Sequence, residues 1–255
     1  TIVLVPKGEV AAGKIAQALA FGPRILVVPS TFDQALQLVL SFTKKHPVTL
    51  VNSLNPYRLQ GQKTASFELV DDLGDAPDYL FIPVGNAGNI TAYWNGFCEY
   101  FDVHKSTKKP RMMGFQAAGA APIVTGKPIS EPRTVASAIR IGNPASWTGA
   151  LNARDESNGV IDSVSDDEIL EAYKILASKE GIFGEPASAA SVAGLTKLSR
   201  EGMNFQDKCI VCVITGTGLK DPDLASAQAS VQLEELPSES GAMEKALEEV
   251  MLGFS

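Results

Sequence analysis

A glycine-rich loop between a buried strand and an amphipathic helix constrains the fold more than any other stretch of this sequence. The apolar run at residues 79–84 predicts the strand, and Pro-Val-Gly-Asn-Ala-Gly-Asn occupies residues 83–89. Apolar side chains then recur at helical spacing through residues 90–103. This arrangement directs free backbone N–H groups at an anion, typically a phosphate. A tight turn without a ligand would show the same pattern, so the loop alone leaves both interpretations open.

The first third of the chain alternates between strand and helix patterns. Helices are predicted at residues 11–21, with Gly22 as the stop, and after a capping box that begins at Thr31. Alternation of this kind predicts a parallel sheet with right-handed crossovers, and therefore an α/β protein. The strands are predicted at residues 2–5, 25–28 and 48–51.

The same two patterns continue along the chain. A second capping box at Ser165 predicts a helix that ends at Gly181. The polar, proline-containing stretch at residues 52–58 is the expected crossing between two domains. Further helices are predicted at residues 59–73, 134–140 and 186–200, and further strands at residues 111–116 and 209–214.

Composition excludes two classes of partner. The net charge of −7 argues against a nucleic-acid partner, and the sequence has no apolar run long enough to span a membrane. One short basic cluster is interpreted as a solvated turn before a strand. It consists of Lys105, Lys108, Lys109 and Arg111.

The three cysteines do not indicate disulfides, although two of them form a C-x-x-C motif. Cys209 and Cys212 lie in a strand-like run, where positions three apart point to opposite faces. We therefore interpret them as core thiols rather than a redox or zinc pair. A reducing compartment fits this usage.

Two further motifs are poor candidates for function. Residues 8–14 fit the G-x-x-x-x-G-K pattern of a nucleotide-binding loop, but Ile15 stands where the Mg²⁺-binding hydroxyl belongs. A helix start with a surface lysine is the better interpretation. His46 and His104 stand alone in polar stretches, where we expect them to be exposed. We therefore expect neither histidine-based catalysis nor a metal site.

Three loops rich in small residues are expected at the carboxyl edge of the sheet, where open α/β folds bind ligands. They span residues 85–89, 185–191 and 215–221. The first can cradle a phosphate, the second lets a helix end approach a flat ligand, and the third supplies hydroxyls and glycines. Together they predict a site for a phosphorylated planar cofactor.

Several stretches of the chain, in matching order, resemble the threonine synthase family, which consists of pyridoxal-phosphate enzymes with the tryptophan synthase β-like fold (fold type II). The Ala-Ile-Arg-Ile-Gly-Asn-Pro-Ala-Ser-Trp sequence at residues 138–147 separates this family from related dehydratases and cysteine synthases. The matching stretches are residues 51–64, 83–94, 116–122, 138–147, 185–191 and 215–222.

The resemblance implies two open parallel-sheet αβα domains. Residues 1–51 would be the remainder of the smaller domain, which is incomplete in this chain. Residues 52–225 would form the large cofactor-binding domain. Residues 226–255 would be an acidic tail with one short helix around residues 242–251.

The resemblance also implies site residues for pyridoxal 5'-phosphate. Thr215 would hydrogen-bond the pyridine nitrogen. Because its hydroxyl is neutral, the ring would be a weaker electron sink than one paired with a carboxylate. Arg58 could bind the substrate phosphate through bidentate bonds, although a surface charge at a helix start is the alternative. The cofactor phosphate would be held by Gly85, Asn86, Ala87, Gly88 and Asn89, and the substrate phosphate by Asn52, Ser53 and Arg58.

One motif of the family is absent. Its Schiff-base lysine lies in a Ser-Phe-Lys-Asp-Arg-Gly stretch followed by Thr-Gly-Asn-Thr, and neither occurs in these 255 residues. Lys7, Lys14 and Lys63 sit in other contexts and are not assigned this role. We therefore expect no catalytic residue in this chain, which resembles the C-terminal portion of such an enzyme and would be inactive alone.

The activity that the resemblance implies is a carbon-oxygen lyase reaction. O-phospho-L-homoserine and water would give L-threonine and phosphate, the last step of threonine biosynthesis, in a cytoplasmic homodimer. Two alternatives remain open. One is another fold type II enzyme, such as a serine/threonine dehydratase. The other is a non-catalytic remnant that binds pyridoxal phosphate or phosphate, which the absent lysine motif favours.

Overall fold

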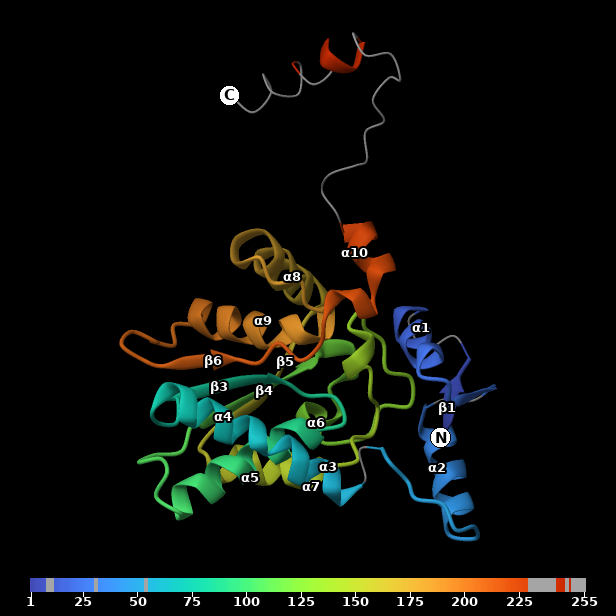
Figure 1. The fold of residues 1–255 in the computed structure, drawn as a ribbon. Coiled ribbons are helices and arrows are strands. Elements are labelled where there is room, and N and C mark those ends of the chain that lie inside the picture. The colour runs from blue at the N-terminus through green and yellow to red at the C-terminus, as the bar shows by residue number, and fades with distance from the viewer. Residues whose placement is uncertain (8–11, 30–31, 53–54, 229–241, 246–247, 249–255) are drawn as a thin grey trace. The chain divides into compact units, whose positions relative to one another are not determined.

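Figure 1 shows the computed structural model, which describes residues 1–255 apart from residues 8–11, 30–31, 53–54, 229–241, 246–247 and 249–255. The chain divides into two compact units, residues 1–221 and residues 222–255. The second unit contains helix α10 (Pro222–Gln228), and of the helix expected around residues 242–251 the described residues, 242–245 and 248, are helical. In the described part of the chain, no helix is both long and apolar enough to cross a membrane.

The amino-terminal strands form a small parallel sheet, as predicted. β1 (Ile2–Pro6) pairs with β2 (Arg24–Val28), and Ile2 lies opposite Arg24. Helix α1 (Ala12–Ala20) connects them and helix α2 (Phe32–Thr43) follows. Gly22 ends the first connection at a φ of +70°, a left-handed conformation that glycine adopts without strain. The capping residue Thr31 and most of the loop at residues 8–14 lie outside the described residues.

The strand predicted at residues 48–51 is wrong, because this segment has no regular secondary structure. Its backbone groups bond locally instead of pairing with another strand. The Val48 N–H donates to the His46 carbonyl at 2.8 Å. The Leu50 carbonyl accepts from the Asn55 side-chain amide at 2.7 Å. An apolar run predicts a strand only where a neighbouring strand can receive its hydrogen bonds.

A larger parallel sheet follows, with the strand order β5-β4-β3-β6. Its strands are β3 (Tyr79–Pro83), β4 (Arg111–Ala117), β5 (Val160–Val164) and β6 (Ile210–Cys212). β5 was not predicted, because Asp162 and Ser163 interrupt its apolar pattern. Asp162 is satisfied by Lys197, whose Nζ lies 2.6 Å from Oδ2. A polar strand residue of this kind depends on a distant partner that local pattern does not reveal.

Helices cover both faces of this sheet (Figure 1). Phe81 and Phe115 pack toward α8 (Asp166–Glu180) and α9 (Pro186–Arg200). Leu80 and Ile82 pack on the other face, with α4 (Thr64–Leu73), α5 (Gly88–Asp102) and α7 (Trp147–Glu156). The alternation follows from the period of two in a strand. It fixes the register of β3, so the loop that follows β3 leaves the sheet at a defined point.

The helix predictions are confirmed in part. The Ser165 capping box is present, since Glu168 N–H donates to Ser165 Oγ at 3.2 Å and Ser165 N–H donates to Glu168 Oε2 at 2.7 Å. The predicted helix at residues 59–73 is instead two helices, α3 (Pro56–Gln62) and α4. Helix α7 was not predicted. The short helices are η1 (Ala118–Ala120), α6 (Pro122–Thr125) and η3 (Gly218–Lys220).

The helix predicted at residues 134–140 is wrong apart from one short turn, η2 (Ser137–Ile139). Asp166 holds the preceding backbone out of a helix. The Thr134 hydroxyl donates to Asp166 Oδ1 at 2.5 Å, and the Val135 N–H donates to Oδ2 at 3.1 Å. This tertiary contact overrides the local propensity.

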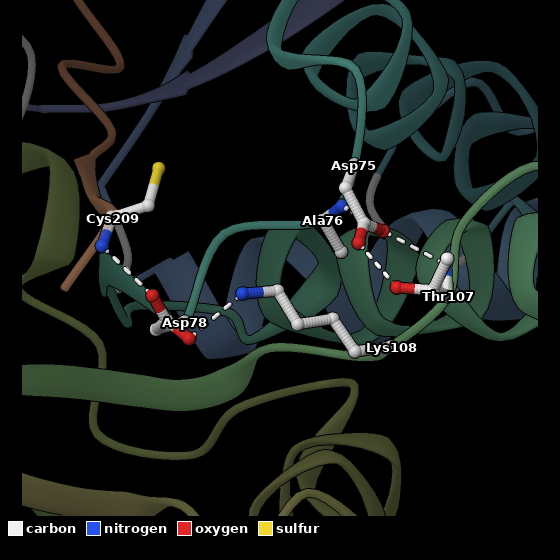
Figure 2. A network of polar contacts seen from close by, with 6 residues as sticks. All are labelled: Asp75, Ala76, Asp78, Thr107, Lys108 and Cys209. Carbon is white, nitrogen blue, oxygen red and sulfur yellow. Dashed lines mark hydrogen bonds and ion pairs between the residues drawn. The ribbon is translucent and has the colours of Figure 1, made fainter.

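A polar network joins the loops that precede β3, β4 and β6 (Figure 2). We call Asp75, Asp78, Thr107, Lys108 and Cys209 the amino-edge network. Asp78 accepts from Lys108 Nζ at 2.7 Å and from the Cys209 N–H at 2.8 Å. Asp75 accepts from the Thr107 hydroxyl at 2.5 Å. These hydrogen bonds, from Lys108 and Thr107 respectively, lower the pKa of Asp78 and of Asp75.

The network corrects two predictions. The basic cluster is a turn before a strand, but it is not merely solvated, since Lys109 lies 5.2 Å from the Trp94 ring centroid and Lys108 forms an ion pair. Cys209 is exposed and is therefore not a core thiol. Cys212 is partly buried, and burial raises the pKa of its thiol to about 12. His46 and His104 are exposed, as predicted.

Candidate functional site

A cavity of about 550 Å³ opens at the carboxyl ends of β3 and β6. The chain runs from β3 to its neighbour β4 on one side. After β5 it crosses to β6, which lies on the other side of β3. Neighbouring strands whose connections leave in opposite directions create a crevice at their carboxyl ends, where open α/β sheets bind ligands. The volume is in the range of sites for small molecules and cofactors.

The structure brings most of the predicted site residues together. Asn52 is described but does not line the cavity, and Ser53 lies outside the described residues. The predicted residues that line the cavity are Arg58, Gly85, Asn86, Ala87, Gly88, Asn89 and Thr215.

The loop after β3 is held in place by its own asparagines. Asn86 Oδ1 accepts from the Ala145 N–H at 2.7 Å. Asn89 Nδ2 donates to the Pro83 carbonyl at 2.6 Å. Ala87 caps helix α5 in a left-handed conformation with a φ of +64° and makes no side-chain cap bond, while the Ile90 N–H donates to Asn89 Oδ1 at 2.8 Å. The Gly88 and Asn89 N–H groups, the first two of α5, have no backbone acceptor within the helix, so this end of the cavity offers donors to an anion.

Gly85 packs against the segment around η2. A Cβ at this position would lie 3.0 Å from Ile139 Cα and 3.2 Å from the Ala138 carbonyl oxygen. The close approach requires glycine and fixes the loop against Ile139, which also lines the cavity. Sequence reasoning missed Ala138 and Ile139 as site residues, although both lie in the stretch that distinguishes the resemblance.

The opposite wall is built where the start of α9 meets the segment after β6. The Glu185 N–H donates to the Gly216 carbonyl at 2.8 Å, and Gly184 forms a bridge with Thr217. A Cβ at Gly216 would lie only 2.1 Å from Glu185 Oε1, so the absence of a side chain at Gly216 leaves room for this carboxylate. The contacts hold Thr215, an exposed neighbour of Gly216, at the cavity wall.

Glu185 begins the predicted site loop at residues 185–191 and lines the cavity, although no role was predicted for its carboxylate. It is 5% exposed and lies at the amino end of α9. Helix ends of this kind favour a negative charge. The available signal was a carboxylate directly before a proline and a run of small, buried residues, since such a position leaves little room for solvent.

Helices α3, α4 and α5 form a third wall, with Arg58, Gln62, Glu68 and Tyr93. Burial raises the pKa of Tyr93, and the nearby charge of Glu68 raises it further. Within the described residues, Arg58 makes no salt bridge, and none of the lining residues is a lysine. Lys63 instead forms a 2.5 Å ion pair with Glu99. Among the described residues, no group of three potential metal ligands occurs.

This geometry suits a ligand with an anionic end and a flat body. The anion would meet the amino end of α5, and the flat body would extend toward Thr215. A phenol, two carboxylates, one guanidinium, the Gln62 amide and the Thr64 hydroxyl complete the polar lining. The residues present therefore fit a phosphorylated aromatic cofactor, as the sequence predicted.

Comparison with protein families and curated proteins agrees with this geometry. A family model described as "Pyridoxal-phosphate dependent enzyme" matches residues 1–216. The threonine synthase of Halalkalibacterium halodurans is 56% identical over 241 residues, which cover 94% of this chain and 68% of that protein. The threonine synthase of Synechocystis sp. is 58% identical over 91% of this chain and 60% of its own length. That of Methanocaldococcus jannaschii is 46% identical over 98% of this chain. The chain therefore spans about 60 to 68% of the length of these relatives.

Solved structures share the fold at low sequence identity. Maize serine racemase superposes with a TM-score of 0.70 at 18% identity, over 98% of this chain and 71% of that chain. The processed form of threonine deaminase isoform 2 from Solanum lycopersicum superposes with a TM-score of 0.70 at 20% identity, over 90% of this chain and 66% of that chain. At such identities the likeness concerns the α/β architecture alone.

Proposed function

The chain belongs to the family of pyridoxal-phosphate dependent enzymes, and from this membership we propose that it is the cofactor-binding part of a threonine synthase. The intact enzyme would convert O-phospho-L-homoserine and water to L-threonine and phosphate. The observation that carries the proposal is the convergence of three elements on one cavity: the loop at residues 85–89, Thr215 and Arg58. The named relatives support threonine synthase over the dehydratases, since they are 46 to 58% identical to this chain.

Each element of the cavity has a task in this proposal. The amino end of α5 and the loop at residues 85–89 would hold the phosphate of pyridoxal phosphate. Thr215 would hydrogen-bond the ring nitrogen without fixing a positive charge on it. When bound, the cofactor supplies an electron sink that stabilises negative charge at the substrate's Cα.

Arg58 would bind the phosphate that leaves from the substrate, whereas Asn52, which does not line the cavity, and Ser53 are assigned to this phosphate by the resemblance alone. A guanidinium presents parallel N–H donors that match two phosphate oxygens. Its charge also favours departure of the phosphate as an anion.

We further propose that the 255-residue chain binds the cofactor without turning over substrate. A threonine synthase needs a base at the substrate's Cα, and the described lining residues include no lysine. The same observation favours a second candidate, a binding protein that retains the cofactor site without the chemistry. The domain division at residues 51 and 225, a homodimer and a cytoplasmic location also remain proposals, which rest on the resemblance alone.

Equilibrium titration of the chain with pyridoxal phosphate, followed by absorbance, tests the proposal. We expect saturable binding that inorganic phosphate weakens by competition. With the cofactor bound, O-phospho-L-homoserine should bind and L-threonine should bind far more weakly, whereas a dehydratase would prefer L-threonine. Failure to bind pyridoxal phosphate would contradict the proposal. Phosphate release at an enzymatic rate would contradict the expected lack of turnover.

A further inference from the structure

We infer that Gln62 is a positioning residue for Arg58, which it holds in a phosphate-binding orientation without neutralising its charge. This inference rests on the proposed function, because it assumes that Arg58 binds the substrate phosphate. Nothing in the sequence patterns singled out Gln62. Its role comes from its place on the cavity wall, one helical turn after Arg58.

Helix α3 presents the two side chains on one face. Arg58 and Gln62 are four positions apart, the spacing at which helical side chains meet. With the Gln62 amide oriented so that its oxygen faces the guanidinium, Oε1 accepts from Arg58 Nη2 at 2.8 Å and from Nε at 3.3 Å. The helix itself is fixed at its start, where Asn55 Oδ1 accepts from the Tyr57 N–H at 2.9 Å.

The chemistry of the partner distinguishes Arg58 from other arginines of the chain. Arg200 donates to both carboxylate oxygens of Glu171, at 2.7 and 3.1 Å, and Arg154 pairs with Asp155 at 2.6 Å. Arg58 has no carboxylate partner in the described part of the chain. Its acceptor is a neutral amide, so the guanidinium keeps its full positive charge while its orientation is restrained.

An arginine that binds phosphate needs both properties. A free guanidinium on a flexible stem loses rotamer freedom when it binds an anion, and this loss weakens binding. A carboxylate partner would restrain it but would also repel the phosphate and compensate its charge. Gln62 occupies only part of the guanidinium's set of donors, so the others remain for the ligand.

Three substitutions separate the effect of charge from the effect of restraint on Arg58. Gln62→Glu keeps an acceptor and adds a negative charge beside Arg58. Gln62→Met keeps the size and helix propensity but removes the acceptor. Gln60→Glu is the matched control, because Gln60 lies on the same helix, is exposed and does not line the cavity. It makes the same change in net charge two positions away.

The experiment is an inorganic phosphate titration of the full 255-residue chain, followed at the Arg58 Nε–H signal by ¹⁵N NMR and assigned with Arg58→Lys. We expect Gln62→Glu to weaken phosphate binding at Arg58 by about tenfold or more, the size of one charge-assisted interaction. Gln62→Met should weaken it by about threefold, and Gln60→Glu by less than about twofold. The backbone amides of Gly85 and Gly88 report the cofactor loop in the same spectra and should show unchanged phosphate affinity in all variants, which also confirms that the variants fold.

Two results would overturn the inference. If Gln62→Glu and Gln60→Glu weaken phosphate binding equally, general charge accounts for the effect and Gln62 does not position Arg58. If the wild-type Arg58 signal does not respond to phosphate, the substrate-phosphate role of Arg58 fails, and the inference fails with it. In that second case, pyridoxal phosphate binding at the Gly85 and Gly88 amides shows whether the cofactor site of the proposed function survives on its own.

Discussion

The two edges of the larger sheet differ in whether the chain itself supplies hydrogen-bond partners for their polar groups. At the amino edge, the network of Figure 2 satisfies its groups within the chain, since Asp78 accepts from both Lys108 and the Cys209 N–H. At the carboxyl edge, Arg58 has only the neutral Gln62 as partner in the described part of the chain, and α5 begins without a side-chain cap. Polar groups that a fold satisfies internally contribute to stability, whereas groups left for a ligand contribute to binding.

This contrast predicts whether a substitution should change stability or ligand binding. The amino-edge network ties together three loops that are far apart in sequence, so its loss should lower the free energy of unfolding and spare the cavity. Substitutions at the carboxyl edge should instead weaken ligand binding and change the free energy of unfolding little.

Asp78→Ala should lower the free energy of unfolding by about 1–3 kcal/mol, because it leaves the Cys209 N–H and the Lys108 ammonium without their acceptor. Urea unfolding followed by circular dichroism measures this. Pyridoxal phosphate affinity under native conditions should stay unchanged. A parallel loss of cofactor affinity would show that the two edges are not independent, which would break the comparison.

Gly85→Ala should reduce pyridoxal phosphate affinity by about tenfold, because the new Cβ would press against Ile139 Cα and shift the loop at residues 85–89. Fluorescence titration measures the change. Gly61→Ala is the matched control, since Gly61 also lines the cavity but has nothing within 4 Å of an added Cβ. Equal losses from the two variants would contradict a phosphate site at residues 85–89.

Thr215→Val should reduce pyridoxal phosphate affinity by about three- to tenfold, the value of one hydrogen bond. The side chain is exposed, so unfolding should change by less than about 0.5 kcal/mol. Thr217→Val is the control, because Thr217 does not line the cavity and its hydroxyl instead accepts from the Leu219 N–H. An unchanged affinity in Thr215→Val would remove Thr215 from the site.

The smallest expected effect is on the pH dependence of stability. The pKa values of Asp75 and Asp78 are lowered in the folded chain, so the unfolded chain binds more protons in mildly acid solution. Their contribution is therefore present above about pH 4 and lost as the pH falls through their folded pKa values. Asp78→Asn should flatten the loss of stability between about pH 5 and 3 by less than about 1 kcal/mol. If Asp78→Asn lost stability more steeply than the wild type over this pH range, the assignment of a lowered pKa to Asp78 would be contradicted.

Local pattern identified the elements whose apolar residues follow a simple period, such as β3 and α5. It failed where a distant partner decides the structure. Asp162 stands in β5 because Lys197 pairs with it, and Thr134 stays out of a helix because Asp166 binds it. Residues 48–51 were predicted as a strand from composition, yet their hydrogen bonds are local.

The site divides in the same way. The glycines and Thr215 could be found because loop chemistry and a family resemblance mark them in the sequence. Gln62 and Ile139 could not, because each owes its place to a neighbour that only folding supplies. The loop at residues 185–191 was predicted, but not that the Glu185 carboxylate lines the cavity. Gln62 owes its place at the site to its hydrogen bonds with Arg58, and the Glu185 carboxylate to the space beside Gly216.

The most direct test of the central claim is a crystal structure of the chain grown with pyridoxal phosphate. We expect the cofactor phosphate at the amino end of α5, within hydrogen-bond distance of the backbone N–H groups at residues 85–89, and the ring nitrogen beside the Thr215 hydroxyl. An empty cavity at saturating cofactor, or a cofactor whose phosphate lies elsewhere, would contradict it.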